Sequence, residues 1–478
     1  MTPEVEIKFA CSPEALESLA VRALEGPARD QRLVSVYFDT PEGDLARRRA
    51  SLRLRTDETG RTIQTFKTGT GLDRAEVEVE TPPGRLHLEG DGFTKALPLQ
   101  DMERLAPRFT VQVRRRTGEM HSGQSRIELA LDQGEILAGG DRLFVCEAEL
   151  ELVEGDRRDL FALALELVED LPLTLSLRTK AARGNALAAG VAAAAVPASP
   201  AASLEADLSC GGALRLALLS ALDALSAQVP ETSADPSAEA VHRLRIALRR
   251  FRSLLSVFRP RWAPAESRAL GKGLRALSRA CGSVRELDVL THQAEPAGAL
   301  VPALLKARRR EAERLVGILS GANARRTLLE GLIFAEDEAW RGAEANTGPA
   351  ETGLADDLQR RWRRIRRLGR VFGNLDAADR HDLRLRIKAL RYAVESLDLP
   401  GWKPLTSRLA PRLKAAQDAL GALNDAEAAA ERLAGLGLSA DARAESARLV
   451  ARLRRKGERA GVARAIPDLI GTPLLFIT

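Results

Sequence analysis

Alternation of polar and apolar positions dominates the part of the chain before residue 186. Eight short runs have a period of two residues and are bounded by glycine, proline or aspartate, which is typical of strands separated by turns. These runs are 4–9, 35–40, 51–56, 62–67, 75–80, 111–116, 125–132 and 146–152. Eight strands that each carry one charged face predict an antiparallel β-barrel, with flanking helices over 12–25 and 159–170.

The pattern changes after residues 186–203, an uncharged segment rich in alanine, serine and proline, which we interpret as a linker. Beyond it apolar residues recur with a period of 3.6. This spacing predicts long helices over 237–258, 302–319, 355–372 and 380–397. We therefore expect an α+β protein with two domains, a barrel domain over 1–190 and an all-α domain over 204–478.

The helical half contains an internal repeat. The run that begins at His242 matches the run that begins at His381, and the run at Gly282 matches the run at Gly421. Both pairs are separated by the same offset along the chain. Two separate matches with one offset predict a pair of similar helical bundles of roughly 140 residues each.

Composition places the chain among globular proteins, because 45% of the residues are hydrophobic and 29% are charged. Four scattered cysteines without a CxxC motif favour reduced thiols, and therefore a cytoplasmic protein. The sequence has no run of 18 apolar residues and no signal-peptide pattern at residue 1, so we expect no membrane span and no secretion.

The two halves differ in charge. Residues 1–200 carry 26 Lys+Arg against 33 Asp+Glu, whereas residues 201–478 carry 46 against 33. The basic half predicts a polyanionic partner.

Charged residues of the predicted strands share faces, because positions i and i+2 of a strand point the same way. These sets are Glu4, Glu6 and Lys8; Arg53 and Arg55; Glu76, Glu78 and Glu80; and Glu147, Glu149 and Glu151. If the apolar faces point outward under helices, the charged faces line the barrel interior. Carboxylates about 4 Å apart repel by about 4 kcal/mol at an effective dielectric constant near 20, which Mg²⁺ or Mn²⁺ would relieve. Alternation alone equally fits a solvated face with cross-strand ion pairs.

Two helices of the second half carry matched basic stripes. Their members follow each histidine at +3, +7 and +10, within an arc of about 80° at about 100° per residue. The stripes are His242, Arg245, Arg249 and Arg252, and His381, Arg384, Lys388 and Arg391. Stacked like charges are unfavourable, so the duplication indicates a bound anion, and the alternative is a solvated basic face.

The first half resembles the CYTH family, the triphosphate tunnel metalloenzymes. Glu4, Glu6 and Lys8 match its ExExK signature, and further matches follow in the family's order. They are Tyr37–Thr40, Leu52–Arg55, Gln64–Lys67, Asp132–Glu135, Cys146–Glu151, and Lys180 with Arg183. The resemblance implies an eight-stranded tunnel that binds a linear triphosphate with Mg²⁺ or Mn²⁺.

The same resemblance implies roles for individual residues. Glu4, Glu6, Glu147 and Glu149 would hold the metal ions. The catalytic set would be Lys8, Arg53, Arg55, Lys67, Glu76, Asp132, Lys180 and Arg183, together with Arg114 or Arg115. Alternation favours Arg114 and Arg116, whereas the family's spacing from Phe109 favours Arg115, so only one neighbour is expected to serve.

The second half resembles the CHAD domain over about 205–470. The two His-x-Leu-Arg helices carry this likeness, with Arg391-Tyr392, Arg285–Asp288 and Leu423–Asp425. The resemblance implies a groove that binds inorganic polyphosphate between two bundles, with Tyr392 beside the basic stripes. Nucleic acid is a less favoured partner because aromatic residues are only 4% of the chain. The arginine-rich run 361–367 stays open as a nucleic-acid surface, a partner-helix surface or another groove wall.

These observations favour a metal-dependent inorganic triphosphatase whose helical domain holds polyphosphate, located in the cytoplasm or on polyphosphate granules. Two alternatives remain at this point. One is an adenylate cyclase with the same barrel, and the other is a polyphosphate-binding scaffold without catalysis.

Overall fold

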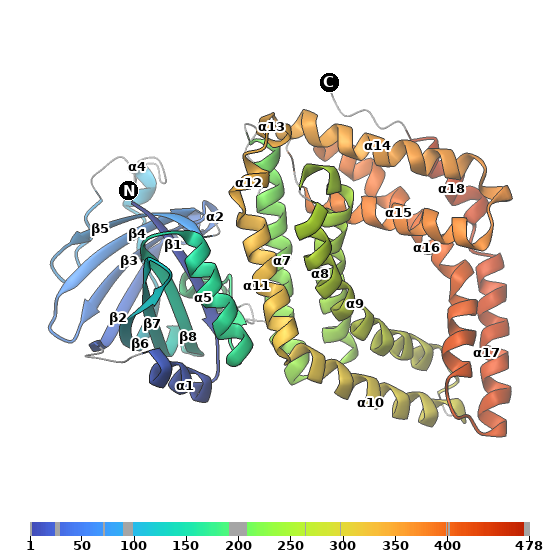
Figure 1. Cartoon of the computed structure of the whole chain (residues 1–478), viewed down its shortest axis with the longest axis horizontal. Coiled ribbons are helices and arrows are strands. Elements are labelled where there is room, and N and C mark those ends of the chain that lie inside the picture. The colour runs from blue at the N-terminus through green and yellow to red at the C-terminus, as the bar shows by residue number, and fades with distance from the viewer. Residues whose placement is uncertain are drawn as a thin grey trace. The chain divides into compact units, whose positions relative to one another are not determined.

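The computed structural model describes residues 2–23, 29–69, 72–88, 99–190, 208–262, 264–296, 298–397, 399 and 402–472. The chain forms two compact units (Figure 1). Unit 1 comprises 1–197 together with 321–336, and unit 2 comprises 198–320 with 337–478. The predicted division into 1–190 and 204–478 differs from these units in the placement of one helical segment.

Unit 1 is built on a single antiparallel sheet. Its strands are β1 (Thr2–Ala10), β2 (Arg29–Asp39), β3 (Ala50–Asp57), β4 (Thr62–Gly69), β5 (Asp73–Glu80), β6 (Ala106–Ser122), β7 (Ser125–Ala138), β8 (Asp141–Glu154) and β9 (Thr174–Leu175). The strand order is β5-β4-β3-β2-β6-β7-β8-β1-β9. A further pairing joins β5 to β1, from Thr2↔Glu76 to Val5↔Asp73, so the order returns to its first strand. The eight predicted strands are confirmed, and the short ninth strand was not predicted.

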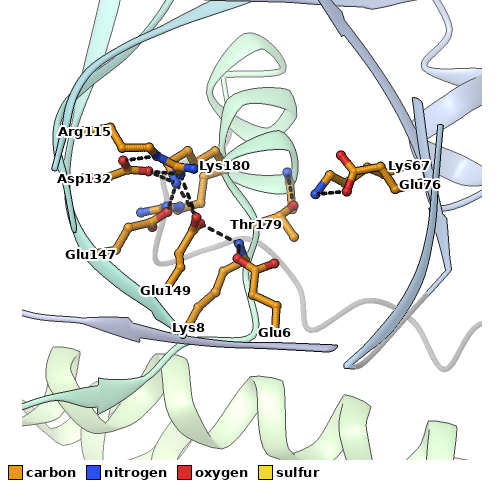
Figure 2. A network of polar contacts seen from close by, with 12 residues as sticks. Glu6, Lys8, Lys67, Glu76, Arg115, Asp132, Glu147, Glu149, Thr179 and Lys180 are labelled. Atoms are coloured by element: carbon orange, nitrogen blue, oxygen red, sulfur yellow. Dashed lines mark hydrogen bonds and ion pairs between the residues drawn. The ribbon is translucent and has the colours of Figure 1, made fainter. Parts of the chain in front are cut away.

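Strand β1 of this sheet separates charged from apolar side chains. Val5, Ile7 and Phe9 of β1 are buried, whereas Glu6 and Lys8 point into the space that the strands surround (Figure 2). The two predicted flanking helices are found as α1 (Pro13–Ala23) and α5 (Arg157–Asp170), and two short helices are α2 (Asp44–Arg47) and α4 (Leu99–Met102).

Helix α6 (Lys180–Ala188) packs against β6, β7 and β8. It approaches β6 so closely at Gly184 that a Cβ atom there would lie 2.1 Å from the Phe109 ring. Residues 186–188 belong to this helix, which corrects the predicted start of the linker. The helix ends before Gly190, whose φ of +68° favours glycine, and residues 191–203 lie outside the described part.

Unit 2 consists of helices in the part of the chain that the structure describes. They are α7 (Cys210–Ala234), α8 (Ala238–Val257), α9 (Pro264–Gln293), α10 (Leu300–Leu319), α12 (Glu338–Arg341), α13 (Glu344–Thr347), α14 (Ala350–Arg370), α15 (Ala377–Ser396), α16 (Lys403–Ala434), α17 (Ala440–Glu458) and α18 (Val462–Ile470). Two 3₁₀ turns are η2 (Arg259–Arg261) and η3 (Phe372–Asn374). The helices predicted from the 3.6 period are found as α8, α10, α14 and α15.

The internal repeat reappears in the packing of unit 2. The starts of α8 and α15, and likewise their ends, are separated by the same offset that separates His242 from His381. The guanidinium of Arg245 lies 3.0 Å from the place of a Cβ on Gly282, and that of Arg384 lies 3.5 Å from the same place on Gly421. In each repeat the arginine of the basic stripe therefore lies beside a glycine of the following helix.

Helix α7 is long and apolar enough, by length and composition alone, to cross a membrane. Buried core helices pass the same test, and 61% of the apolar window of α7 is buried inside the structure. We therefore describe α7 as a core helix of unit 2.

Helix α11 (Ala322–Glu336) lies within the helical half of the sequence but belongs to unit 1. It packs against α5 and β9. Arg325 Nε donates to the Val168 carbonyl at 2.9 Å, Arg326 pairs with Glu169, and the Leu72 amide donates to Glu336 at 3.2 Å. Its repeat counterpart α18 instead packs on α14 and α16 of unit 2.

We expect a fragment of residues 1–190 to be less stable than the same fragment joined by a Gly/Ser linker to residues 321–336. The short fragment lacks the helix that covers α5 and β9, and thermal unfolding should show a midpoint about 5 °C lower or more. The control is a fusion that carries the 321–336 segment in shuffled order. Equal midpoints for all three proteins would contradict a stabilising role for α11.

Candidate functional site

A network of charged side chains lies inside the sheet of unit 1 (Figure 2). Strands β1, β6, β7 and β8 and the first turn of α6 supply Glu6, Lys8, Arg115, Asp132, Glu147, Glu149, Lys180 and Arg183. Asp132, Glu147 and Glu149 are only 0%, 1% and 7% exposed. Charges buried to this extent are stable only when they are paired.

Arg115 joins two of the buried carboxylates. Its Nε and Nη2 atoms donate to both oxygens of Asp132 at 2.7 and 2.6 Å, and Nη2 also donates to Glu149 at 2.7 Å. The strand register places Arg115 directly opposite Asp132, so the two side chains meet on one face of the sheet. Such bidentate pairs between arginine and a carboxylate are strong and fix both groups in orientation.

Helix α6 brings two further cations to the carboxylates. Thr179 caps the helix by accepting from the Ala182 amide at 3.0 Å, and Lys180 is its first residue. Lys180 Nζ lies 2.6 Å from Asp132 and 2.9 Å from Glu149, and it also pairs with Glu147. A lysine in the first turn opposes the helix dipole, so these carboxylates account for its position.

The remaining contacts of this network connect it to β1. Lys8 Nζ lies 2.6 Å from Glu149 and also pairs with Glu6, while Arg183 pairs with Glu147. Glu149 therefore accepts from three cations that come from three different elements. Eight of the predicted residues thus meet in one place: Glu6, Lys8, Arg115, Asp132, Glu147, Glu149, Lys180 and Arg183.

The electrostatics of the network keep both kinds of group charged. Burial alone would raise the pKa of Asp132, but Arg115 and Lys180 outweigh it and lower the pKa to about 2. Burial likewise opposes the charge on Glu149, yet Lys180 and Lys8 hold its pKa well below the usual range. Burial would lower the pKa of Lys180, but Asp132 and Glu147 raise it.

Strand β3 contributes two arginines, and the charge of Arg55 is the less compensated of the two. Arg53 Nη1 donates to the Tyr37 hydroxyl at 3.3 Å, and the Nε atoms of Arg53 and Arg55 are buried without a hydrogen bond. Burial, together with Arg53 and Arg115, lowers the pKa of Arg55 to about 10. An anion bound beside Arg55 would stabilise this positive charge. Sequence reasoning assigned no role to Tyr37, although its aromatic ring lies in a motif of the resembled family.

The wall of the sheet that faces this network carries a separate ion pair. Lys67 of β4 and Glu76 of β5 lie 3.1 Å apart, and Figure 2 shows both at a distance from Asp132 and Glu149. The predicted catalytic residues therefore occupy two opposite walls.

Arg115, and not Arg114, is the arginine of β6 that faces the interior. Arg114 is exposed and donates to Asp30 at 2.8 Å, so its assignment as a catalytic residue is wrong. Arg116 lies on the same outer face and pairs with Glu17. The alternation of polar and apolar residues along β6 predicted the wrong face. The face of Arg115 also carries three apolar residues that pack beneath α6, which are Phe109, Val111 and Val113.

Three buried carboxylates could hold a metal ion. One ligand oxygen each from Asp132, Glu147 and Glu149 lies within 4.8 Å of the others, and Glu6 Oε2 is buried without a hydrogen bond. Carboxylate oxygens suit hard divalent cations, so these residues could hold such an ion. The predicted ligand Glu4 has a side chain outside the described part of the structure.

The basic stripes of unit 2 come together between α8 and α15, which pack against each other. They form a basic cluster of Arg245, Arg249, Arg252, Arg384, Lys388 and Arg391. Arg249 Nη1 donates to the Tyr392 hydroxyl at 2.7 Å, and both Arg249 and Arg391 lie over the Tyr392 ring. The Nε atoms of Arg384 and Arg391 are buried without a hydrogen bond.

Lys388 lies at the centre of this cluster. Its pKa is lowered from 10.5 to about 7, mainly by burial. The positive charges of the neighbouring arginines add to this effect, in the order Arg249, Arg245, Arg384 and Arg252. The folded protein therefore holds this lysine in an environment that disfavours its charge and would favour an added anion.

The two histidines lie at the edge of the cluster. Burial and Arg285 lower the pKa of His242, and His381 Nδ1 lies 3.4 Å from the Asn424 amide. Asn424 is the repeat counterpart of Arg285, so the two histidines occupy equivalent places.

The arginine-rich run 361–367 lies on α14. Trp362 and Ile365 point into the core, whereas Arg363, Arg364 and Arg367 are exposed. The run is therefore an ordinary amphipathic helix with a basic outer face.

Comparison with known protein families matches the CYTH domain to residues 2–184 and the CHAD domain to residues 216–434. The chain is a CYTH domain followed by a CHAD domain. This order confirms the resemblance found in the sequence, and the ion-pair network described above lies within the CYTH domain.

An inorganic triphosphatase of Haemophilus influenzae is 33% identical over 204 residues. The match covers 39% of this chain, and the chain spans 55% of the length of that relative. Among solved structures, the CHAD domain of the plant Ricinus communis is 22% identical, with 57% of this chain and 94% of that chain covered and a TM-score of 0.43. HpAC1 of Hippeastrum, described with a dominant triphosphatase activity, is 18% identical, with 40% and 97% covered and a TM-score of 0.30.

Proposed function

We propose that the CYTH domain hydrolyses inorganic triphosphate with the help of Mg²⁺ or Mn²⁺, and that the CHAD domain binds polyphosphate. The observation that carries the first part is the convergence of Lys8, Arg115 and Lys180 on buried carboxylates, next to Arg53 and Arg55, whose Nε atoms are buried without a hydrogen bond. The relation to an inorganic triphosphatase supports it.

In this proposal the basic residues bind the substrate. Arg53, Arg55 and Lys67 would take phosphoryl oxygens along the tunnel, and Arg115 and Lys180 would exchange part of their contacts with carboxylates for contacts with phosphate. Guanidinium and ammonium groups held in place by buried carboxylates need little reorganisation when the charge on phosphorus changes. Positioning and electrostatics suffice for phosphoryl transfer, so the reaction requires no nucleophilic side chain.

The acidic residues would hold the metal. Asp132, Glu147 and Glu149 with Glu6 would bind the ion, which neutralises phosphate charge and orients the attacking water. The carboxylates are paired with Lys180, Arg183 and Lys8, so a bound ion and a bound triphosphate would replace these ion pairs together. We therefore expect a bound metal ion to increase the affinity for triphosphate, and bound triphosphate to increase the affinity for the metal ion.

Release of phosphate from triphosphate, long-chain polyphosphate and ATP, each with Mg²⁺ and with Mn²⁺, tests the assignment. We expect triphosphate to be the best substrate and turnover to stop when EDTA is added. Preferred turnover of ATP with release of pyrophosphate would favour a cyclase instead. Absence of turnover with all substrates, together with polyphosphate binding, would favour a scaffold.

The assignment of polyphosphate to the CHAD domain rests on the basic cluster. Six cationic groups from two helices converge there, and two of them have buried Nε atoms without a hydrogen bond. A linear chain with about one negative charge per phosphate would neutralise them and release its counterions. Nucleic acid remains less favoured, because Tyr392 is buried under two arginines and offers no free face for stacking.

Polyphosphate affinity should fall as the pH rises from 6 to 8. A bound anion raises the pKa of Lys388 above about 7, so binding is coupled to the uptake of one proton. The affinity can therefore change by at most about tenfold per pH unit. Titrations of long chains at fixed salt measure this effect. Lys388→Arg is the control, since arginine stays charged and should remove the dependence between pH 7 and 8. An unchanged slope in this variant would contradict the role of Lys388.

Without ligand the same lysine has the opposite effect on stability. Its pKa is lower in the folded state than its ordinary value of 10.5, so the unfolded chain binds more protons between about pH 7 and 10.5. The free energy of unfolding of the CHAD domain should therefore rise with pH in this window through Lys388.

A further inference from the structure

An open depression at the end of the basic stripe of α8 is lined by Arg252, Arg275, Ser278 and Arg279, and has a volume of about 300 Å³. The three arginines are exposed. Arg252 comes from α8, and the other three residues come from consecutive turns of α9. We refer to it as the Arg252 pocket. It adjoins the rest of the basic cluster. Besides burial, Arg252 contributes to lowering the pKa of Lys388, and Arg249 contributes to lowering the pKa of Arg252.

The positive charge of this pocket is not neutralised by the described residues. None of its three arginines forms an ion pair with a carboxylate in the described ranges of the chain. Ser278 Oγ donates to the Leu274 carbonyl at 2.7 Å and so does not neutralise charge. Burial, then Arg275 and Arg249, lower the pKa of Arg252. Arg275 and Arg279 are four residues apart on one helix, where like charges repel.

The second repeat provides an internal comparison. At the repeat offset, the counterparts of the pocket residues are Arg391, Lys414, Gln417 and Asp418. There Lys414 pairs with Asp418 at 2.9 Å, and Arg391 lies 3.6 Å from Glu395.

The first repeat lacks both of these carboxylates. Arg279 stands where the second repeat has Asp418, and Ser256 stands where it has Glu395. One end of the basic cluster therefore carries three uncompensated positive charges, whereas the equivalent corner of the other repeat is balanced.

We propose that the Arg252 pocket binds the terminal phosphoryl group of an inorganic polyphosphate chain and so fixes the direction in which the chain lies across the basic cluster. This proposal rests on polyphosphate binding by the CHAD domain. An internal phosphate of the chain carries one negative charge, whereas a terminal phosphoryl group has a second ionisation with a pKa near about 6 and is a dianion at pH 8. Three guanidinium groups around one cavity match three terminal oxygens and the higher charge.

Free phosphate offers the same dianionic phosphoryl chemistry as a chain end. The two sources differ in one respect, because only a chain end would continue from the pocket into the basic cluster. A chain end should therefore bind far more tightly than orthophosphate, through the contacts that Arg249 and Lys388 add.

The test uses the full-length protein and two polyphosphates of equal length. One has free ends, and the other has both terminal phosphoryl groups blocked as monoanionic phosphoramidates. At pH 8 and fixed salt, we expect the wild type to bind the free-ended chain about tenfold more tightly, because the blocked end loses charged hydrogen bonds. The double variant Arg275→Gln/Arg279→Gln should bind both chains equally. The matched control Lys414→Gln/Asp418→Asn, at the corresponding corner of the second repeat, should keep the preference.

Each other outcome has a distinct meaning. Equal binding of both chains by the wild type, or an equal loss for both chains in Arg275→Gln/Arg279→Gln, would overturn the pocket while leaving polyphosphate binding intact. Displacement of the free-ended chain by orthophosphate at comparable concentration would assign the pocket to free phosphate. Failure of the wild type to bind the blocked chain at all would instead contradict polyphosphate binding along the basic cluster.

Discussion

Replacing Glu147 by glutamine is expected to lower kcat/KM for triphosphate by about a thousandfold or more, while the domain stays folded. Glu147 is 1% exposed and lies between Lys180 and Arg183. Glutamine keeps the size of the side chain but removes the charge that would hold a metal ion. It also removes the carboxylate that pairs with Arg183 and one of the three carboxylates around Lys180, so the positions of both cations against phosphate change. Phosphate release under saturating Mg²⁺ or Mn²⁺ measures the effect.

The control for this variant is Arg114→Gln. Arg114 lies on the same sheet but on its outer face, paired with exposed Asp30, and its replacement should leave turnover within about twofold of the wild type. Circular dichroism and thermal unfolding of both variants establish that the fold is kept. Full turnover by Glu147→Gln, or by the wild type in excess chelator, would exclude the proposed metal-assisted reaction.

Reversing the charges of one basic stripe is expected to weaken binding of long polyphosphate by about a thousandfold at low salt, since each lost charged contact contributes about 1.5–3 kcal/mol. The two variants are Arg245→Glu/Arg249→Glu on α8 and Arg384→Glu/Lys388→Glu on α15. Because both stripes meet in one cluster, the combined variant should lose less than the product of the two effects. The slope of log affinity against log salt should fall by about two in each double variant.

A matched control for these reversals is Arg363→Glu/Arg364→Glu on the exposed face of α14. These arginines lie outside the basic cluster and should change the affinity by only a few fold. Titrations of all four proteins at one salt concentration decide the matter. Near-wild-type binding by either stripe variant, or multiplicative effects in the combined variant, would exclude a single shared cluster.

The sequence alone predicted eight strands of the first half and four long helices of the second, because local periodicity reflects burial on one face of a strand or helix. It placed Glu6, Lys8, Glu147 and Glu149 on charged strand faces, and the structure brings their side chains into one network. It also determined the repeat, since the same offset recurs in the ends of α8 and α15 and in the glycines that receive Arg245 and Arg384.

Only the tertiary structure decided whether Arg114 or Arg115 of β6 faces the interior of the sheet. Arg114 and Arg115 point to opposite faces, and the concave face is set by the curvature of the whole sheet and by the packing of α6 on β6. Alternation gives no signal for this choice, because the concave face is apolar near Val111 and charged at Arg115. Only the resembled family's spacing from Phe109 favoured Arg115.

The tertiary structure also decided the roles of residues far apart in the chain. Lys180 reaches Asp132, and α11 joins unit 1 although its repeat counterpart α18 packs within unit 2. The Arg252 pocket differs in charge from the equivalent corner of the other repeat because of two positions, Ser256 and Arg279. The difference is recognised only from the ion pairs that the equivalent residues form in the other repeat. Periodicity records which face of an element is buried, whereas the partner of a buried charge depends on which elements meet, and only the folded chain determines that.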